Sequence, residues 1–254
     1  MALGLNFLRR TEVGPALFTV KEVKLGRQTS VLHITLTQKM NGKVREEVVG
    51  YITQSNLDKE QGKSLDTSWA LHPPAPSVDL CKLDLGKDEQ WAEVPSLPHA
   101  AFRKASNQVI FSFPRQGQLV QGAVDEWIRL RTSDSSERFT NETLGYVSDM
   151  WPQMIEGMTV EDLYTPGKIT KEKAKQAAGF WYPTVLLNLD IKKPLPKEGV
   201  EWLFVRARAK QVKNGRFDLE VVIMDETGDL VALSNHVCLI LDASRNLAKR
   251  STKL

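Results

Sequence analysis

The sequence has few residues that bind metals or form disulfides. Its 254 residues include only two cysteines, Cys81 and Cys238, which lie far apart and fit no metal-ligand spacing. Four histidines are present, and they form no HExxH or similar cluster: His33, His72, His99 and His236. We therefore expect reduced thiols in an intracellular compartment, no metal site and no other cofactor.

Long apolar runs, a strong net charge and the common nucleotide-binding motifs are also absent. No hydrophobic stretch approaches the ~20 residues that a membrane-spanning helix needs. The opening MALGLNFLRR places its arginines after the short apolar stretch, which is the wrong order for a secretory signal. A net charge of +3, with basic and acidic residues interleaved, argues against a nucleic-acid partner. The absence of GxGxxG, GxxxxGKS/T and GxSxG argues against the commonest nucleotide-binding and serine-hydrolase classes.

What the sequence does contain is the alternation of apolar and polar residues that is typical of strands. It occurs in residues 17–25, 30–38 and 43–53, and Asn41-Gly42 between the last two is a strong hairpin signal. These segments predict an antiparallel meander with one buried face. The composition, 41% hydrophobic and 26% charged, is that of an ordinary globular protein.

A proline-rich stretch divides the chain. Residues 57–104 include Pro73 and Pro74, which would break a helix or a central strand, so we expect a crossover on the surface. Beyond it, strand patterns return and flank two helical patterns. Strands are expected at 108–114, 122–131, 182–191, 201–212, 216–224 and 230–241, and helices over about 140–154 and 165–179.

The two halves of the chain have similar patterns. GRQTSVLHITLTQKMNGKVREEVVGYI resembles GRFDLEVVIMDETGDLVALSNHVCLI in strand length, in the Gly-Arg opening and in a glycine-containing hairpin. This similarity indicates an internal duplication. We expect a first unit at 1–56, a linker at 57–104, a second unit at 105–242 and a basic tail at 243–254.

Four segments carry a further similarity. They are FLRRTEVGPALFTVKEVKLGRQTSVLHITLTQ in the first half and LGYVSD, YPTVLLNLDIKKP and GDLVALSNHV in the second. In this order and spacing they resemble the acyl-CoA thioesterase family with the double hot-dog fold, particularly its fungal thioesterase-like members. The resemblance spans most of the chain and implies an α+β fold of two curved antiparallel sheets, each wrapping a central helix. The first unit would lack its N-terminal strand and helix, because residues 1–12 are too few to hold them.

The resemblance also implies a site made of Asp149, Thr184 and His236. In the family, an aspartate, a hydroxyl and an amide hold and activate a water that attacks a thioester carbonyl, while backbone N–H groups stabilise the oxyanion. His236 stands where the family usually has glutamine, and a histidine adds a group that titrates near neutral pH. The implied function is an acyl-thioester hydrolase whose substrate is an acyl-CoA or an acyl group on a carrier protein.

Each of these residues also has an ordinary structural interpretation. The first helix is expected to begin at Thr140 or Asn141 and to contain Pro152 in its last turn. Asp149 then lies opposite the apolar stripe of this helix, as a solvated residue would. Thr184 falls on the polar face of its strand, and His236 has the alternation of a half-buried histidine.

Aromatic side chains close to Thr184 in the sequence are candidates for the acyl pocket. Such a ligand needs an apolar lining with few polar groups, although ordinary core packing explains the same residues equally well. The candidates are Phe180, Trp181, Tyr182 and Trp127.

Two further functions stay open at this point. One is an enzyme of secondary metabolism that releases, cyclises or rearranges a polyketide-like intermediate, and the other is a non-catalytic binding module. The fold itself implies a homodimer, because hot-dog units pair. The C-terminal residues TKL approach the peroxisomal Ser-Lys-Leu signal, so the expected location is the cytoplasm or the peroxisome.

Overall fold

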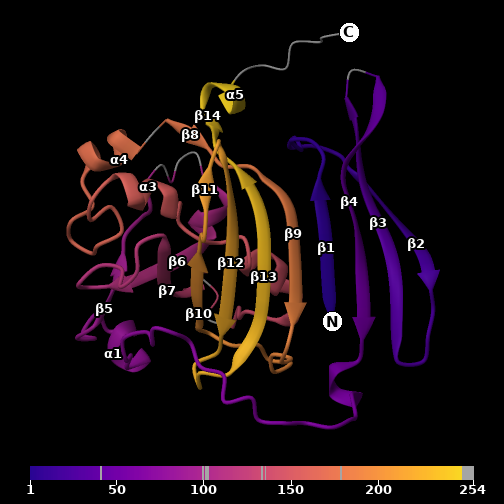
Figure 1. Ribbon diagram of the computed structural model, residues 1–254, viewed down its shortest axis with the longest axis horizontal. Coiled ribbons are helices and arrows are strands. Elements are labelled where there is room, and N and C mark those ends of the chain that lie inside the picture. Colours follow the sequence, from indigo (N-terminus) through magenta and orange to yellow (C-terminus); the bar gives the residue numbers. More distant parts are fainter. Residues whose placement is uncertain are drawn as a thin grey trace.

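The structure is dominated by a single antiparallel sheet (Figure 1). It is a computed structural model that describes residues 1–40, 42–98, 100, 103–132, 134, 136–177 and 179–247. The order of strands across the sheet is β2-β3-β4-β1-β9-β13-β12-β10-β7-β6-β5, with β11 paired to β12. A separate two-stranded ribbon contains β8 and β14.

The strands of the first half are β1 (Ala2–Phe7), β2 (Leu17–Lys24), β3 (Thr29–Met40) and β4 (Lys43–Ser55). The strands of the second half are β5 (Trp91–Val94), β6 (Val109–Pro114), β7 (Ala123–Leu130), β8 (Phe180–Trp181), β9 (Thr184–Ile191), β10 (Leu203–Arg208), β11 (Val212–Lys213), β12 (Arg216–Met224), β13 (Leu230–Leu239) and β14 (Leu241–Asp242). The helices are α1 (Leu80–Asp84), α2 (Leu144–Val147), α3 (Met154–Thr159), α4 (Lys171–Ala177) and α5 (Ser244–Leu247), with 3-10 turns η1 (Leu57–Lys59), η2 (Ala105–Gln108) and η3 (Asn141–Thr143).

The two halves of the sheet share one connectivity. Outward from the junction between β1 and β9, the first half runs β1-β4-β3-β2 and the second runs β9-β13-β12-β10. If the four strands of each set are numbered along the chain, their order outward from the junction is 1-4-3-2 in both halves. The second half continues with β7, β6 and β5, whereas β2 is the last strand on its side.

Strand β1 joins the two halves and was not predicted. Gly4 pairs with Tyr51 on β4 and with Asn188 on β9. The approach of β1 to β4 requires glycine at Gly50, since a Cβ there would lie 2.1 Å from the Gly4 carbonyl oxygen. The expectation that residues 1–12 contain no strand is therefore wrong, although the described residues of 1–55 contain no helix.

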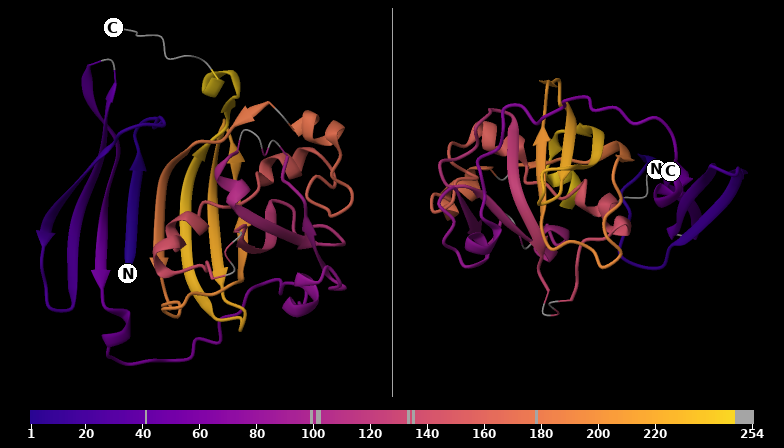
Figure 2. Two further views of the ribbon diagram at one scale, coloured as in Figure 1. Left: turned by 180° about the vertical axis from the view of Figure 1, so that it is seen from behind. Right: turned by 90° about the horizontal axis from the view of Figure 1, so that it is seen from below.

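Helices cover only the second half of the sheet (Figure 2). The main core lies between α2, α3 and one face of the sheet from β5 to β9, and includes fully buried Leu144, Phe217 and Ile223. A smaller cluster contains Leu83, Trp91, Trp127, Trp202 and Phe204. Strand β2 is exposed along its whole length, including Leu17, Phe18, Val20 and Val23. The main core thus belongs mainly to the second half.

Apart from β1, most strand predictions match the structure closely, and the predicted linker contains two elements that were not predicted. Residues 57–104 contain α1 and also β5, which pairs with β6. The predicted hairpin is confirmed by the pairing of Met40 with Lys43 and by a φ of +77° at Gly42, while Asn41 lies outside the described residues. No helix in the described part of the chain is long and apolar enough to cross a membrane.

The long helix expected over about 140–154 is interrupted. It consists of η3, α2 and, after a break, α3. Pro152 has no N–H for an intrahelical hydrogen bond and disfavours helical geometry at Trp151, so the helix cannot continue through this point. The break places the chain between Val147 and Met154 in an irregular turn.

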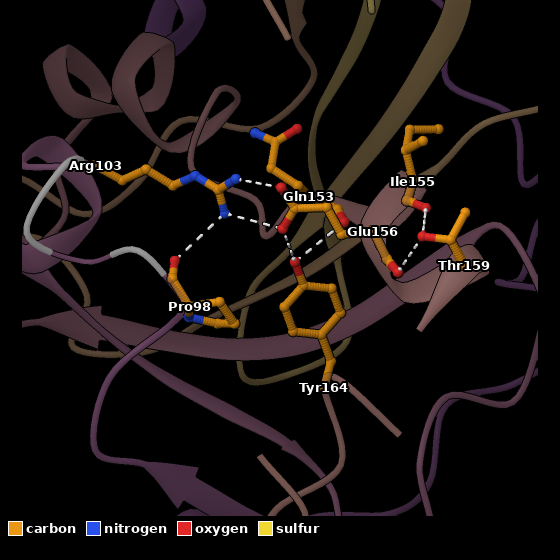
Figure 3. Close-up of polar contacts among 7 residues, drawn as sticks. All are labelled: Pro98, Arg103, Gln153, Ile155, Glu156, Thr159 and Tyr164. Atoms are coloured by element: carbon orange, nitrogen blue, oxygen red, sulfur yellow. Dashed lines mark hydrogen bonds and ion pairs between the residues drawn. The ribbon is translucent and has the colours of Figure 1, made fainter. Parts of the chain in front are cut away.

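A buried ion pair fixes Arg103, in the segment between β5 and β6, to α3 (Figure 3). The Arg103 guanidinium donates to both carboxylate oxygens of Glu156, at 2.5 and 3.3 Å, and the Tyr164 hydroxyl lies 3.3 Å from the same carboxylate. Glu156 is 2% exposed. Because an unpaired charge at this depth is costly, this contact holds the chain at Arg103 in place.

Candidate functional site

Three polar side chains from distant parts of the sequence meet at one edge of the main core. Thr184 Oγ1 donates to Asp149 Oδ1 at 3.4 Å, and His236 Nδ1 lies 3.6 Å from the same oxygen. Asp149 follows α2, Thr184 begins β9 and His236 lies within β13. The structure therefore brings together all three residues that the family resemblance implied.

Asp149 lies in the interrupted helical region and not within a regular helix. The Asp149 N–H donates to the Tyr146 carbonyl at 3.1 Å, in a turn that closes α2. Gly145, four residues earlier, lies close to Leu3 of β1. The Asp149 side chain is 43% exposed, so solvent reaches it, as the solvated-face interpretation expected. Its carboxylate nevertheless points to Thr184 and His236, because the turn before Pro152 redirects the chain.

A β-bulge determines where Thr184 points. Cys238 pairs with Thr184, whereas the preceding Val237 pairs with Leu186, which leaves Val185 as an extra residue on β9. Paired residues of an antiparallel sheet share a face, so Thr184 lies on the core face with Cys238. The prediction that Thr184 lies on the polar strand face is therefore wrong, because that prediction assumed unbroken alternation.

His236 is buried and held by a neighbour on its own strand. The residue is 2% exposed, and its Nε2 lies 2.9 Å from Ser234 Oγ. Ser234 Oγ also donates to the Asn188 carbonyl of β9 at 2.9 Å. Ser234 was not predicted as a site residue, although its position two residues before His236 places it on the same strand face.

The surrounding protein shifts the pKa values of Asp149 and His236 in opposite directions. Although the Asp149 side chain keeps an exposed surface, the protein atoms packed around its carboxylate displace much of the nearby water and raise its pKa to about 6, against a smaller lowering effect of the Thr184 hydrogen bond. Burial lowers the pKa of His236 to about 4. The expectation that His236 titrates near neutral pH is therefore wrong, and Asp149 is the group of this pair that titrates closest to neutrality.

The cysteine beside the site is a protonated thiol. Cys238 Sγ lies 3.7 Å from Thr184 Oγ1, and burial raises the pKa of this thiol to about 12. In this state Cys238 is a poor nucleophile, so the group contributes packing at the site. No set of three or more His, Cys, Asp or Glu residues that could hold a metal ion occurs within the described ranges.

The predicted aromatic residues occupy different places. Tyr182 is 8% exposed and packs edge-on against Phe217, which contacts Trp151 in the same way. Phe180 is exposed, at 6.5 Å from the Tyr182 ring. Trp181 is half-buried in β8.

Trp127 belongs to a different part of the molecule. It packs against Phe204 in the smaller apolar cluster, at 5.5 Å between ring centroids. Its neighbours Glu126 and Ile128 point to the opposite face of β7, where Ile128 joins the main core. The structure therefore separates Trp127 from the Asp149 group, which corrects its prediction as part of the acyl pocket.

The geometry is suited to holding a small polar molecule beside an apolar surface. Asp149 and neutral His236 each present a hydrogen-bond acceptor or donor, and Thr184 donates to the Asp149 carboxylate. Tyr182, two residues before Thr184, adds an apolar surface nearby. Such an arrangement fits general base chemistry on a water molecule.

Comparison with known proteins points to one family. The family model of the acyl-CoA thioesterase C-terminal domain matches residues 64–240, and that of the N-terminal domain matches residues 1–55. The thioesterase-like protein TwmA of Talaromyces wortmannii is 40% identical over 274 aligned residues, which cover 97% of this chain and 78% of that protein.

Solved structures share the fold at low sequence identity. An acyl-CoA thioesterase II, TesB2, from Mycobacterium marinum has a TM-score of 0.59 and 18% identity, covering 95% of this chain and 80% of that chain. A conserved protein with a hot-dog fold from Alicyclobacillus acidocaldarius has a TM-score of 0.65 and 17% identity, covering 94% and 77%. The sheet of this chain is thus of the hot-dog type.

Proposed function

Since this chain belongs to the acyl-CoA thioesterase family, we propose that it hydrolyses acyl thioesters by adding water to the thioester carbonyl. The observation that carries this proposal is the meeting of Asp149, Thr184 and His236 around one carboxylate oxygen. A carboxylate with a raised pKa that solvent still reaches is typical of a general base, which supports a catalytic role over a binding role.

In the proposed reaction, Asp149 is the general base. Its ionised carboxylate accepts a proton from water as the water oxygen attacks the thioester carbon. Thr184 donates to the carboxylate and keeps it oriented, and His236 holds the water from the other side. The tetrahedral intermediate then collapses, the carbon–sulfur bond breaks, and the thiolate takes up the proton held by Asp149. The products are a carboxylic acid and a free thiol.

The substrate that this proposal requires is an acyl group on coenzyme A or on the pantetheine arm of a carrier protein. Both deliver the same thioester, so the site chemistry is common to them. The buried ring of Tyr182 supplies apolar surface for the acyl chain close to Thr184. Exposed Phe180 and half-buried Trp181 are candidates to contact the pantetheine arm.

The test is hydrolysis by an Asp149→Asn variant. We expect kcat/KM for acyl-CoA to fall about 10²–10⁴-fold, because the amide cannot accept the proton of water. Free thiol release measures the rate across a panel of acyl-CoAs and acyl-pantetheines. Asp190→Asn is the matched control, since Asp190 is half exposed on β9 and pairs with Lys192. Full activity of Asp149→Asn with unchanged Tm would end the assignment.

The same assay separates hydrolysis from the secondary-metabolism alternative. An enzyme that cyclises or rearranges the acyl group and leaves the thioester intact releases no thiol, whereas a hydrolase releases one thiol per acid formed; ring closure onto the thioester carbonyl also releases a thiol but yields no acid. Mass spectrometry of the products completes the distinction, because only hydrolysis adds one water to the acyl group.

We also infer that the fold is a double hot-dog in which β1–β4 represent a first unit without a central helix. The shared connectivity of the two sheet halves supports this, as does the division of the family match between 1–55 and 64–240. The apolar side chains exposed on β2 support pairing of two chains as a homodimer. Light scattering at micromolar concentration tests the dimer, and a monomer at all concentrations contradicts it.

A further inference from the structure

The hydrogen bonds around His236 determine which ring nitrogen carries its proton. Nε2 lies 2.9 Å from Ser234 Oγ, and that oxygen lies 2.9 Å from the Asn188 carbonyl oxygen. Ser234 is fully buried and His236 is 2% exposed, so solvent does not replace either contact. Ser234 Oγ and His236 Nε2 therefore both have fixed hydrogen-bond partners.

A count of protons leaves one arrangement that satisfies both contacts. A serine hydroxyl has a single proton, and a carbonyl oxygen can only accept. Ser234 must then donate to Asn188 and accept from an Nε2–H of His236. We propose that Ser234 is a positioning residue that fixes His236 in the Nε2–H tautomer and leaves Nδ1 as an acceptor facing Asp149.

The opposite nitrogen faces the Asp149 carboxylate and has no hydrogen-bond partner in the described structure. Nδ1 is buried, and it lies 3.6 Å from Asp149 Oδ1, which is too long for a direct hydrogen bond. Burial also lowers the pKa of His236 to about 4, so the ring is neutral and Nδ1 keeps its lone pair at neutral pH.

This tautomer has a direct consequence for the proposed hydrolysis, on which this step of the inference rests. Because Nδ1 is buried beside Asp149, the attacking water reaches it only when the partly exposed Asp149 side chain moves aside. The water then meets two acceptors, the Asp149 carboxylate and Nδ1, and donates one proton to each. Its lone pair then points away from both, toward the thioester carbon. As the new carbon–oxygen bond forms, one proton moves to Asp149, while the other stays on the new hydroxyl and remains hydrogen-bonded to Nδ1.

The tautomer can be observed directly by NMR. In ¹⁵N-labelled protein at pH 7, long-range ¹H–¹⁵N correlation distinguishes a protonated ring nitrogen from an unprotonated one. We expect protonated Nε2 and unprotonated Nδ1 for His236, whose signals disappear in His236→Gln. Protonated Nδ1 in the native protein overturns the proposal, whatever the kinetics show.

Variants of Ser234 test the positioning role. In Ser234→Ala we expect a mixture of tautomers and about a tenfold fall in kcat with little change in KM, as one neutral hydrogen bond is lost. Ser234→Thr should restore both the tautomer and kcat, because it keeps the hydroxyl. Ser112→Ala is the control, since it removes another fully buried serine hydroxyl, on β6. An unchanged tautomer and unchanged kcat in Ser234→Ala contradict the role.

The two proposals fail in different ways. If Asp149→Asn keeps its activity, the hydrolase assignment fails while the NMR assignment of His236 stands. If His236 carries its proton on Nδ1, the role of Ser234 fails while Asp149 keeps its place as the base.

Discussion

The pH dependence of hydrolysis is the sharpest prediction, because it identifies which residue titrates. The pKa of Asp149 is raised from 3.8 to about 6, and only its ionised form accepts a proton from water. At pH 7 about nine-tenths of the enzyme is then active, and at pH 5 about one-tenth. We expect kcat/KM to fall roughly tenfold per pH unit below 6.

The variant His236→Gln shows whether Asp149 or His236 is the group whose protonation lowers the rate. The pKa of His236 is lowered to about 4, so the imidazole stays neutral through the range in which the rate falls. Glutamine does not titrate, and we expect the acid limb of the profile to keep its midpoint in this variant. Thr184→Val removes the hydrogen bond that lowers the Asp149 pKa, so its midpoint should move to higher pH.

The measurement is kcat/KM for one acyl-CoA between pH 4.5 and 8, in buffers of constant ionic strength. Loss of the acid limb in His236→Gln would assign the titration to the imidazole and refute the argument. A midpoint near 4 in the native enzyme would show that the Asp149 carboxylate is well solvated, and would refute it equally.

Two predictions concern stability. Glu126 is fully buried on β7 without a hydrogen-bond partner in the described structure, so Glu126→Met should stabilise by about 1–3 kcal/mol at pH 7. Burial raises the Glu126 pKa, so the native protein should lose stability as pH rises from about 4.5 through that pKa, and urea unfolding at pH 5 and 8 measures this. Arg103→Met leaves the Glu156 carboxylate unpaired and should cost about 3–5 kcal/mol, a loss that adding Glu156→Gln should largely recover.

Much of the sheet could be predicted because its strands alternate regularly and its hairpins carry glycine. The ends of β2, β3 and β4 fall within two residues of their predicted positions. Strand β1 was missed because six residues with a central Gly4 give too short a pattern to distinguish a strand from a loop. Its place is set by Gly50 on a strand more than forty residues away.

At the site, sequence periodicity did not predict which way the side chains point. Family resemblance identified Asp149, Thr184 and His236, but periodicity placed the first two on solvated faces. Asp149 is indeed partly exposed, but Pro152 ends the helical repeat, so its carboxylate still points to Thr184 and His236. For Thr184 the expectation was wrong, because the extra Val185 shifts it to the other face. Trp127 was misplaced because β7 is buried on both faces, so its hydrophobicity does not reveal which cluster it joins.

The position of β1 has a practical consequence. A strand at the edge of a sheet can be lost with little effect on its neighbours, but β1 lies between β4 and β9, and Leu3 and Phe7 pack against the main core. Each of its two long sides is hydrogen-bonded to a different half of the sheet. Substitutions that weaken β1 would therefore uncouple two blocks of strands.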